Sequence, residues 1–112
     1  MDVYFRTKKM QGLCSSSKEM TRKLGSRLAT KLQQRLAELQ AAESLADISR
    51  LPPARCHELK QDREGQLSVD LVHPYRLVFE PGDDPVPCKV DGGLDWYRVT
   101  SVVVVEVADT HP

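Results

Sequence analysis

Alternation of apolar and polar residues predicts two short strands in the middle of the chain. Residues 66–72 place an apolar side chain at every second position from Leu67, and residues 75–79 do the same from Tyr75. A period of two puts these side chains on one face of a pleated strand, against a core. His73 and Pro74 separate the runs, and a proline there suits a tight turn. The pattern therefore predicts an antiparallel hairpin that holds Arg76 rigidly.

A helical period predicts that the first half of the chain is helical. Leucines along residues 27–42 recur at spacings of four, four and three and form one apolar stripe. These leucines are Leu28, Leu32, Leu36 and Leu39. A preceding helix is expected from Ser16, whose spacing to Glu19 is typical of a capping box, with a start near Thr7 as the alternative. Gly25 is expected to end that helix, and Ser26 to cap the next.

The remaining segments complete an α+β plan. Residues 101–107 are apolar and β-branched, which predicts a central strand with both faces covered. Residues 80–100 are rich in Pro, Gly and Asp and are expected to form a long excursion that Trp96 pins to the body. Residues 3–5 fit either a short edge strand or an anchor for the first helix. We expect helices packed on a small antiparallel sheet, in one domain over residues 1–112.

Composition narrows the class of protein. The chain has 112 residues, an ordinary apolar fraction and no apolar run near the length of a membrane span. The first residues lack the apolar core of a signal peptide, so we expect a cytoplasmic protein without membrane contact. The three cysteines are widely spaced without a CxxC pair, which favours reduced thiols over a disulfide or a zinc site. The aspartates of residues 83–95 lack the spacing of a calcium loop, so we expect neither metal nor cofactor.

Charge is segregated along the chain although the formal net charge is zero. Residues 1–60 hold 12 Lys and Arg against 6 Asp and Glu, and residues 61–112 hold 4 against 10. Basic residues recur every four positions in the helical half and lack interleaved acids; they are Lys23, Arg27, Lys31 and Arg35. Two interpretations stay open: a surface for a polyanion such as RNA, or a solvated helix face in a protein whose halves attract each other.

Groups able to move protons or to neutralise phosphate gather around the predicted sheet. They are His57, Lys60, Arg76, Asp109 and His111. Such a set equips a site for metal-free RNA cleavage, in which one group deprotonates a ribose 2′-hydroxyl, cations stabilise the phosphorane and another group protonates the leaving 5′-oxygen. The alternative is structural: His57 is a half-exposed strand residue, Arg76 bridges to an acid on a neighbouring strand, and His111 lies near the chain end.

At these residues the chain resembles the RelE/ParE toxin superfamily, in its HigB-like branch of plasmid-maintenance killer proteins. The resemblance covers nearly the whole chain and rests on HELK, then QDREGQLS, YRLVF, GGLDW and the terminal VEVADTH. It implies a RelE-like α+β fold of two N-terminal helices on an antiparallel sheet of three to five strands. It implies cleavage of mRNA in the ribosomal A site, restrained by a helix-turn-helix antitoxin through which alone the toxin meets DNA.

The resemblance also assigns roles by position. His57, Lys60 and Arg76 match the histidine and lysine of the sheet and the arginine of the YRL strand, whereas Asp109 and His111 match the acid and histidine of a terminal Asp-Tyr-His motif. Thr110 replaces that tyrosine, so stacking on a nucleobase is lost there, and Gln61 replaces a usual glycine. Two alternatives remain: a non-catalytic toxin that binds a protein target, as gyrase poisons on this scaffold do, and an attenuated toxin acting as corepressor.

Overall fold

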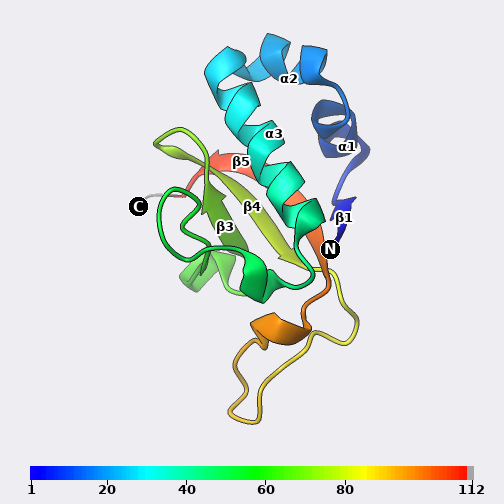
Figure 1. Ribbon diagram of the computed structural model, residues 1–112, viewed down its shortest axis with the longest axis vertical. Coiled ribbons are helices and arrows are strands. Elements are labelled where there is room, and N and C mark those ends of the chain that lie inside the picture. Colours follow the sequence, from blue (N-terminus) through cyan, green and yellow to red (C-terminus); the bar gives the residue numbers. More distant parts are fainter. Residues whose placement is uncertain (111–112) are drawn as a thin grey trace.

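The computed structural model describes residues 1–110, in which helices pack on one face of a five-stranded sheet (Figure 1). The three α-helices are α1 (Lys8–Cys14), α2 (Ser17–Leu24) and α3 (Ser26–Ala41). The strands are β1 (Asp2–Phe5), β2 (His57–Glu58), β3 (Leu67–Asp70), β4 (Tyr75–Pro81) and β5 (Ser101–Asp109). The α+β class is confirmed, and the described residues contain one α-helix more than the two expected.

The sheet is mixed, with strand order β1-β5-β4-β3-β2. β1 runs parallel to β5 and the other neighbours are antiparallel, so the expectation of a purely antiparallel sheet is wrong. β5 lies between β1 and β4, as a central strand should. Its two faces differ, because Val102 and Val104 are buried whereas Val103 and Val105 are only partly buried. The helices cover one face of this strand and the other face is only partly buried, so the expectation that both faces are covered holds fully on the helix side alone.

Capping residues explain where the helices begin and end. Ser16 Oγ accepts a hydrogen bond from the Glu19 amide at 3.2 Å, as the sequence predicts. Thr7 Oγ1 likewise accepts from the Met10 amide at 3.1 Å, so the alternative start forms a separate helix, α1. Gly25 has a φ of 81° and is the capping position of both α2 and α3. Ser26 is already helical, so the expected serine cap is wrong; glycine alone tolerates the turn without strain.

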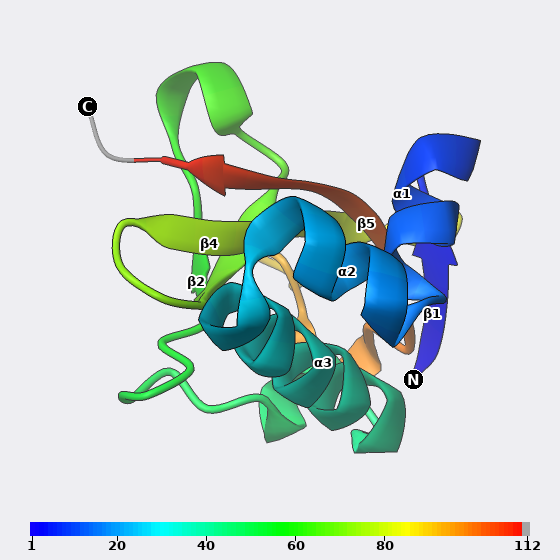
Figure 2. The ribbon, with the colours of Figure 1, turned by 90° about the horizontal axis from the view of Figure 1, so that it is seen from above.

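The core lies between α3 and the sheet (Figure 2). Leu32, Leu36 and Leu39 are buried there, so the predicted leucine stripe does face the core, with Leu28 at its partly buried margin. Burying such a leucine stabilises a fold by about 2 kcal/mol. Trp96, in the 3₁₀ turn η3 (Trp96–Arg98), is buried as expected and ties the long excursion to the body.

The 3₁₀ turn η2 (Gln61–Arg63) lies over part of the opposite face of the sheet, on the side away from α3 (Figure 2). Arg63 pairs with Glu106 of β5 at 3.3 Å. Ser68 and Val78, which pair across β3 and β4, are fully buried on this side. Within residues 1–110, no helix combines the length and the apolar character that crossing a membrane requires.

Candidate functional site

Arg76 and Asp70 form the centre of the candidate site, at the end of the sheet where β3 turns into β4. The two residues are cross-strand partners, and Arg76 Nε lies 3.2 Å from Asp70 Oδ1. Arg76 Nη1 donates to Thr110 Oγ1 at 3.0 Å, so the segment after β5 also meets this guanidinium. The Arg76 side chain is 11% exposed. The structural alternative for Arg76, a bridge to an acid on a neighbouring strand, is confirmed with Asp70 as that acid.

Arg55 places a second guanidinium on the same carboxylate. Arg55 Nε lies 3.4 Å from Asp70 Oδ2, and the Asp70 amide donates to Ala54 O at 2.7 Å. The φ of Arg55 is 49°, a left-handed conformation that non-glycine residues rarely adopt and that costs about 1 kcal/mol or more. The bond between the Asp70 amide and Ala54 therefore holds a strained residue next to Asp70. Two positive charges share one negative charge, so the group carries one net positive charge.

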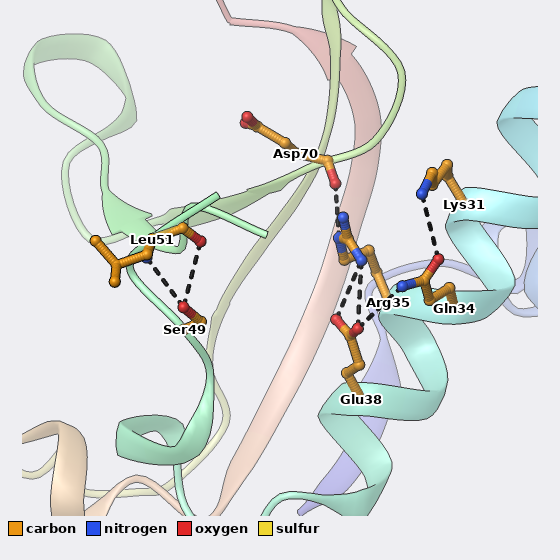
Figure 3. Close-up of polar contacts among 7 residues, drawn as sticks. All are labelled: Lys31, Gln34, Arg35, Glu38, Ser49, Leu51 and Asp70. Atoms are coloured by element: carbon orange, nitrogen blue, oxygen red, sulfur yellow. Dashed lines mark hydrogen bonds and ion pairs between the residues drawn. The ribbon is translucent and has the colours of Figure 1, made fainter. Parts of the chain in front are cut away.

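Arg35 fixes this strand from the helix side. Its Nε donates to the backbone oxygen of Asp70 at 2.8 Å, and its Nη1 donates to Glu38 at 3.3 Å. Figure 3 shows the Asp70 carboxylate directed away from Arg35, so backbone and side chain of one residue serve opposite faces of the sheet. The Arg35 side chain is 1% exposed.

The predicted basic stripe is therefore wrong for Arg35, and Lys23 belongs to a different helix from the remaining members. Arg35 is buried and cannot face a polyanion, because positions four residues apart rotate by about 40° around a helix at each step. Lys23 is exposed but lies on α2, whereas Arg27 lies exposed on α3. Lys31 is half-buried and donates to Gln34 Oε1 at 3.4 Å.

A pocket of about 280 Å³ opens beside the two arginines. Its polar lining consists of Arg55, Asp70, His73, Tyr75 and Arg76. Guanidinium groups recognise phosphate and carboxylate oxygens, so the chemistry of this pocket suits an anion. Sequence reasoning did not select Arg55 or Asp70. The alternation along β3 could have selected Asp70, because it places the Asp70 side chain on the face opposite Leu67 and Val69. No local sequence pattern distinguishes Arg55.

His57 lies on the same face of the sheet as Arg76. It pairs with Ser68, which is two residues from Asp70 on β3, and residues two apart on a strand share a face. The Cα atoms of His57 and Arg76 are then roughly 12 Å apart. His57 Nδ1 lies 3.0 Å from Arg55 O, so the strained residue that contacts Asp70 also orients the imidazole. The structure thus brings His57 and Arg76 to one face of the sheet.

Two of the other predicted residues, Lys60 and Asp109, are set apart from this group. The Leu59 amide donates to Gln66 O, which places Leu59 about 13 Å along the strands from the Asp70–Arg76 pair, and Lys60 lies one residue beyond it. Asp109 pairs with Tyr75, whose side chain belongs to the helix-covered face, so strand register directs Asp109 away from Arg76. His111 lies outside the described residues.

Thiol and metal chemistry are separate from the site. Burial raises the pKa of Cys56 to about 12 and that of Cys14 to about 11, so both thiols stay protonated near neutral pH. Cys14, Cys56 and Cys88 are all unpaired. Within residues 1–110, no cluster of three or more His, Cys, Asp or Glu side chains is placed to hold a metal ion.

Comparison with known proteins gives no match: no family model matches this chain, and no curated protein matches it.

Proposed function

We propose that the chain is a toxin of a type II toxin–antitoxin system and acts as a metal-free mRNA endoribonuclease on the ribosome. The observation that carries the proposal is the placement of Arg76 beside Arg55 and Thr110, on the same face of the sheet as His57. Two guanidiniums that share a pocket, with an imidazole on the same face of the sheet, are the kinds of group that hold and cleave a phosphodiester. The same proposal includes a RelE-like arrangement of the helices and the sheet and a cytoplasmic location of the protein.

In the proposed reaction the ribose 2′-oxygen attacks the adjacent phosphorus. The bond from phosphorus to the 5′-oxygen breaks, leaving a 2′,3′-cyclic phosphate and a 5′-hydroxyl. Arg76 and Arg55 stabilise the charge on the phosphorane oxygens. His57 transfers one of the two protons, either from the 2′-hydroxyl or to the leaving oxygen. His111, which follows Thr110 in sequence, is our candidate for the other transfer, and Lys60 and Asp109 have no direct role.

The proposed binding partners are those implied by the resemblance to RelE/ParE toxins. Lys23, Arg27 and Lys31 provide positive charge for mRNA or ribosomal RNA, because long-range attraction between a basic surface and a phosphate backbone does not require base contacts. A helix-turn-helix antitoxin neutralises the toxin and brings it to DNA only indirectly.

The test is induced expression in bacteria of the wild-type protein and of the Arg76→Ala, His57→Ala and His111→Ala variants. Arg98→Ala is the matched control, because Arg98 is exposed on η3, in the excursion pinned by Trp96. We expect the wild type and the control to arrest growth and to produce mRNA fragments with 5′-hydroxyl ends, and the three site variants to do neither. Equal arrest by all five proteins would refute this active site, provided that thermal melting shows each variant to be folded.

A second candidate is a non-catalytic toxin-fold protein. The observation that favours it is Asp70, whose carboxylate already neutralises part of the charge on Arg55 and Arg76. Thr110 on Arg76 also offers no aromatic ring. Growth arrest with DNA-damage signalling, unchanged by His57→Ala, would identify a gyrase-inhibitor-like protein. Absence of arrest together with tighter operator binding by the antitoxin would identify an attenuated toxin that acts as corepressor.

A further inference from the structure

A second groove lies across the β3–β4 turn from the Asp70–Arg76 pocket, between the start of α3 and residues 72–75. Its volume is about 370 Å³, and a neighbouring hollow of about 300 Å³ continues it along α3. The side chains that line the two hollows are Leu24, Ser26, Arg27, Leu28, Thr30, Lys31, Val72, His73 and Tyr75. None of these lining residues is acidic, and Arg27 and Lys31 add positive charge beside the apolar side chains of Leu24, Leu28 and Val72.

Tyr75 connects the groove with the Asp70–Arg76 pocket. It lines the groove beside Arg27 and also the pocket that contains Arg55 and Arg76. Tyr75 and Arg76 are consecutive on β4, so their side chains leave the strand on opposite faces. Tyr75 is 45% exposed, although Leu77 on the same face is fully buried. A chain that crosses the turn therefore meets an aromatic ring on one side and two guanidiniums on the other.

A single-stranded nucleic acid has the chemistry that this arrangement recognises. Unstacked bases pack on exposed aromatic rings, and each such contact is sequence-tolerant because every base has a π-face. The phosphates on either side of a stacked base need cations, and Arg27 is exposed at the groove rim with Lys31 one turn further along α3. An apolar peptide would pack on Leu24, Leu28 and Val72 but would leave the charges of Arg27 and Lys31 without a counter-charge.

We propose that this groove is a nucleobase subsite, in which Tyr75 stacks on a base next to the scissile phosphate and Arg27 and Lys31 neutralise the neighbouring phosphates. The inference rests on the proposed function and deepens it, because it locates the substrate across the β3–β4 turn.

The test is a titration of single-stranded RNA of about ten nucleotides, carrying 2-aminopurine at one position, with the wild-type protein and variants at Tyr75. We expect Tyr75→Leu to weaken binding by roughly 10-fold or more, as loss of one base–aromatic stack does, and Tyr75→Phe to bind within about 3-fold of wild type. Tyr97→Leu is the control, because Tyr97 is 82% exposed and lies in η3, far along the chain from the groove. An oligonucleotide with an abasic residue at the stacked position should bind the wild type and Tyr75→Leu equally.

The outcomes separate the subsite from the proposed function. RNA binding that is lost in Arg76→Ala but unchanged in Tyr75→Leu overturns the subsite and leaves the nuclease proposal standing. Binding that depends on Tyr75, without cleavage by the protein on ribosomes, supports the subsite and overturns the nuclease. Binding of an acidic peptide but not of RNA, or of neither, overturns the subsite.

Discussion

The guanidinium of Arg35 donates to the backbone oxygen of Asp70 at 2.8 Å, and the Asp70 carboxylate leaves the other side of the strand to meet Arg76. One buried helix residue therefore sets the position of the acid in the candidate site. Since Asp70 also contacts Arg55, the path from α3 to the pocket passes through a single residue of β3. Changes in the helix should be felt at the anion pocket through this contact.

Replacing Arg35 by alanine should destabilise the fold by about 3 kcal/mol, because it removes a buried side chain and leaves the Asp70 carbonyl without its donor. Arg35→Lys should also destabilise, since lysine lacks the fork that reaches Asp70 and Glu38 together. Urea denaturation gives both values. Arg27→Ala, at an exposed position of the same helix, should change stability by less than about 0.5 kcal/mol. Equal effects at the two positions would contradict the anchoring role.

A charge on the leucine stripe should unfold the protein. Leu32 is fully buried on the sheet-facing side of α3. Leu32→Asp would lower the free energy of unfolding by about 4 kcal/mol or more, because it leaves a carboxylate without water or partner. Gln33→Asp, one position along and exposed, is the matched control and should melt near the wild-type temperature. Circular dichroism during heating measures both. A folded Leu32→Asp protein with normal melting would show that the helix presents another face to the sheet.

Removal of the negative charge at Asp70 should strengthen anion binding. Asp70→Asn keeps the side-chain shape and leaves Arg55 and Arg76 without their shared counter-charge, so affinity for single-stranded RNA should rise about 5-fold at low salt. The gain should shrink as salt increases, because salt screens these charges. Asp62→Asn, at an exposed acid on η2, removes the same charge elsewhere and is the control. If the two variants bind RNA equally, the carboxylate does not compete with phosphate for the arginines.

Stability should depend on pH through Asp83, which joins the two ends of the long excursion. Partial burial raises the pKa of Asp83, but hydrogen bonds from Thr100 and Ser101 outweigh this effect and hold the pKa below its ordinary value. A carboxylate with a lowered pKa stabilises the folded state above its unfolded pKa of about 3.9, and this contribution is lost as pH falls through the folded value. Asp83→Asn should therefore lower the melting temperature at pH 7, and the difference from wild type should narrow toward pH 3. A difference that stays constant with pH would mean that the amide loses shape-dependent contacts, not charge.

Local periodicity was enough to predict the elements that use it. The 3.6-residue stripe of α3, the alternation of β3 and β4, the turn at His73 and Pro74 and the cap at Ser16 are all set by side chains within a few residues of each other. The α+β class follows from these elements, since an apolar helix stripe and an apolar sheet face must cover each other.

Tertiary structure decided which charges meet. The sequence places Arg35 in a series of exposed basic residues, but its position around α3 turns it toward β3. The parallel pairing of β1 with β5 has no local sequence pattern that predicts it. Strand register put Asp70 against Arg76 and moved Lys60 and Asp109 away from the site. A shift of one residue would exchange the faces of a strand, and register depends on packing between segments distant in sequence. For that reason the sequence alone determined the elements and the kinds of group available, and only the folded chain determined the group formed by Arg55, Asp70 and Arg76.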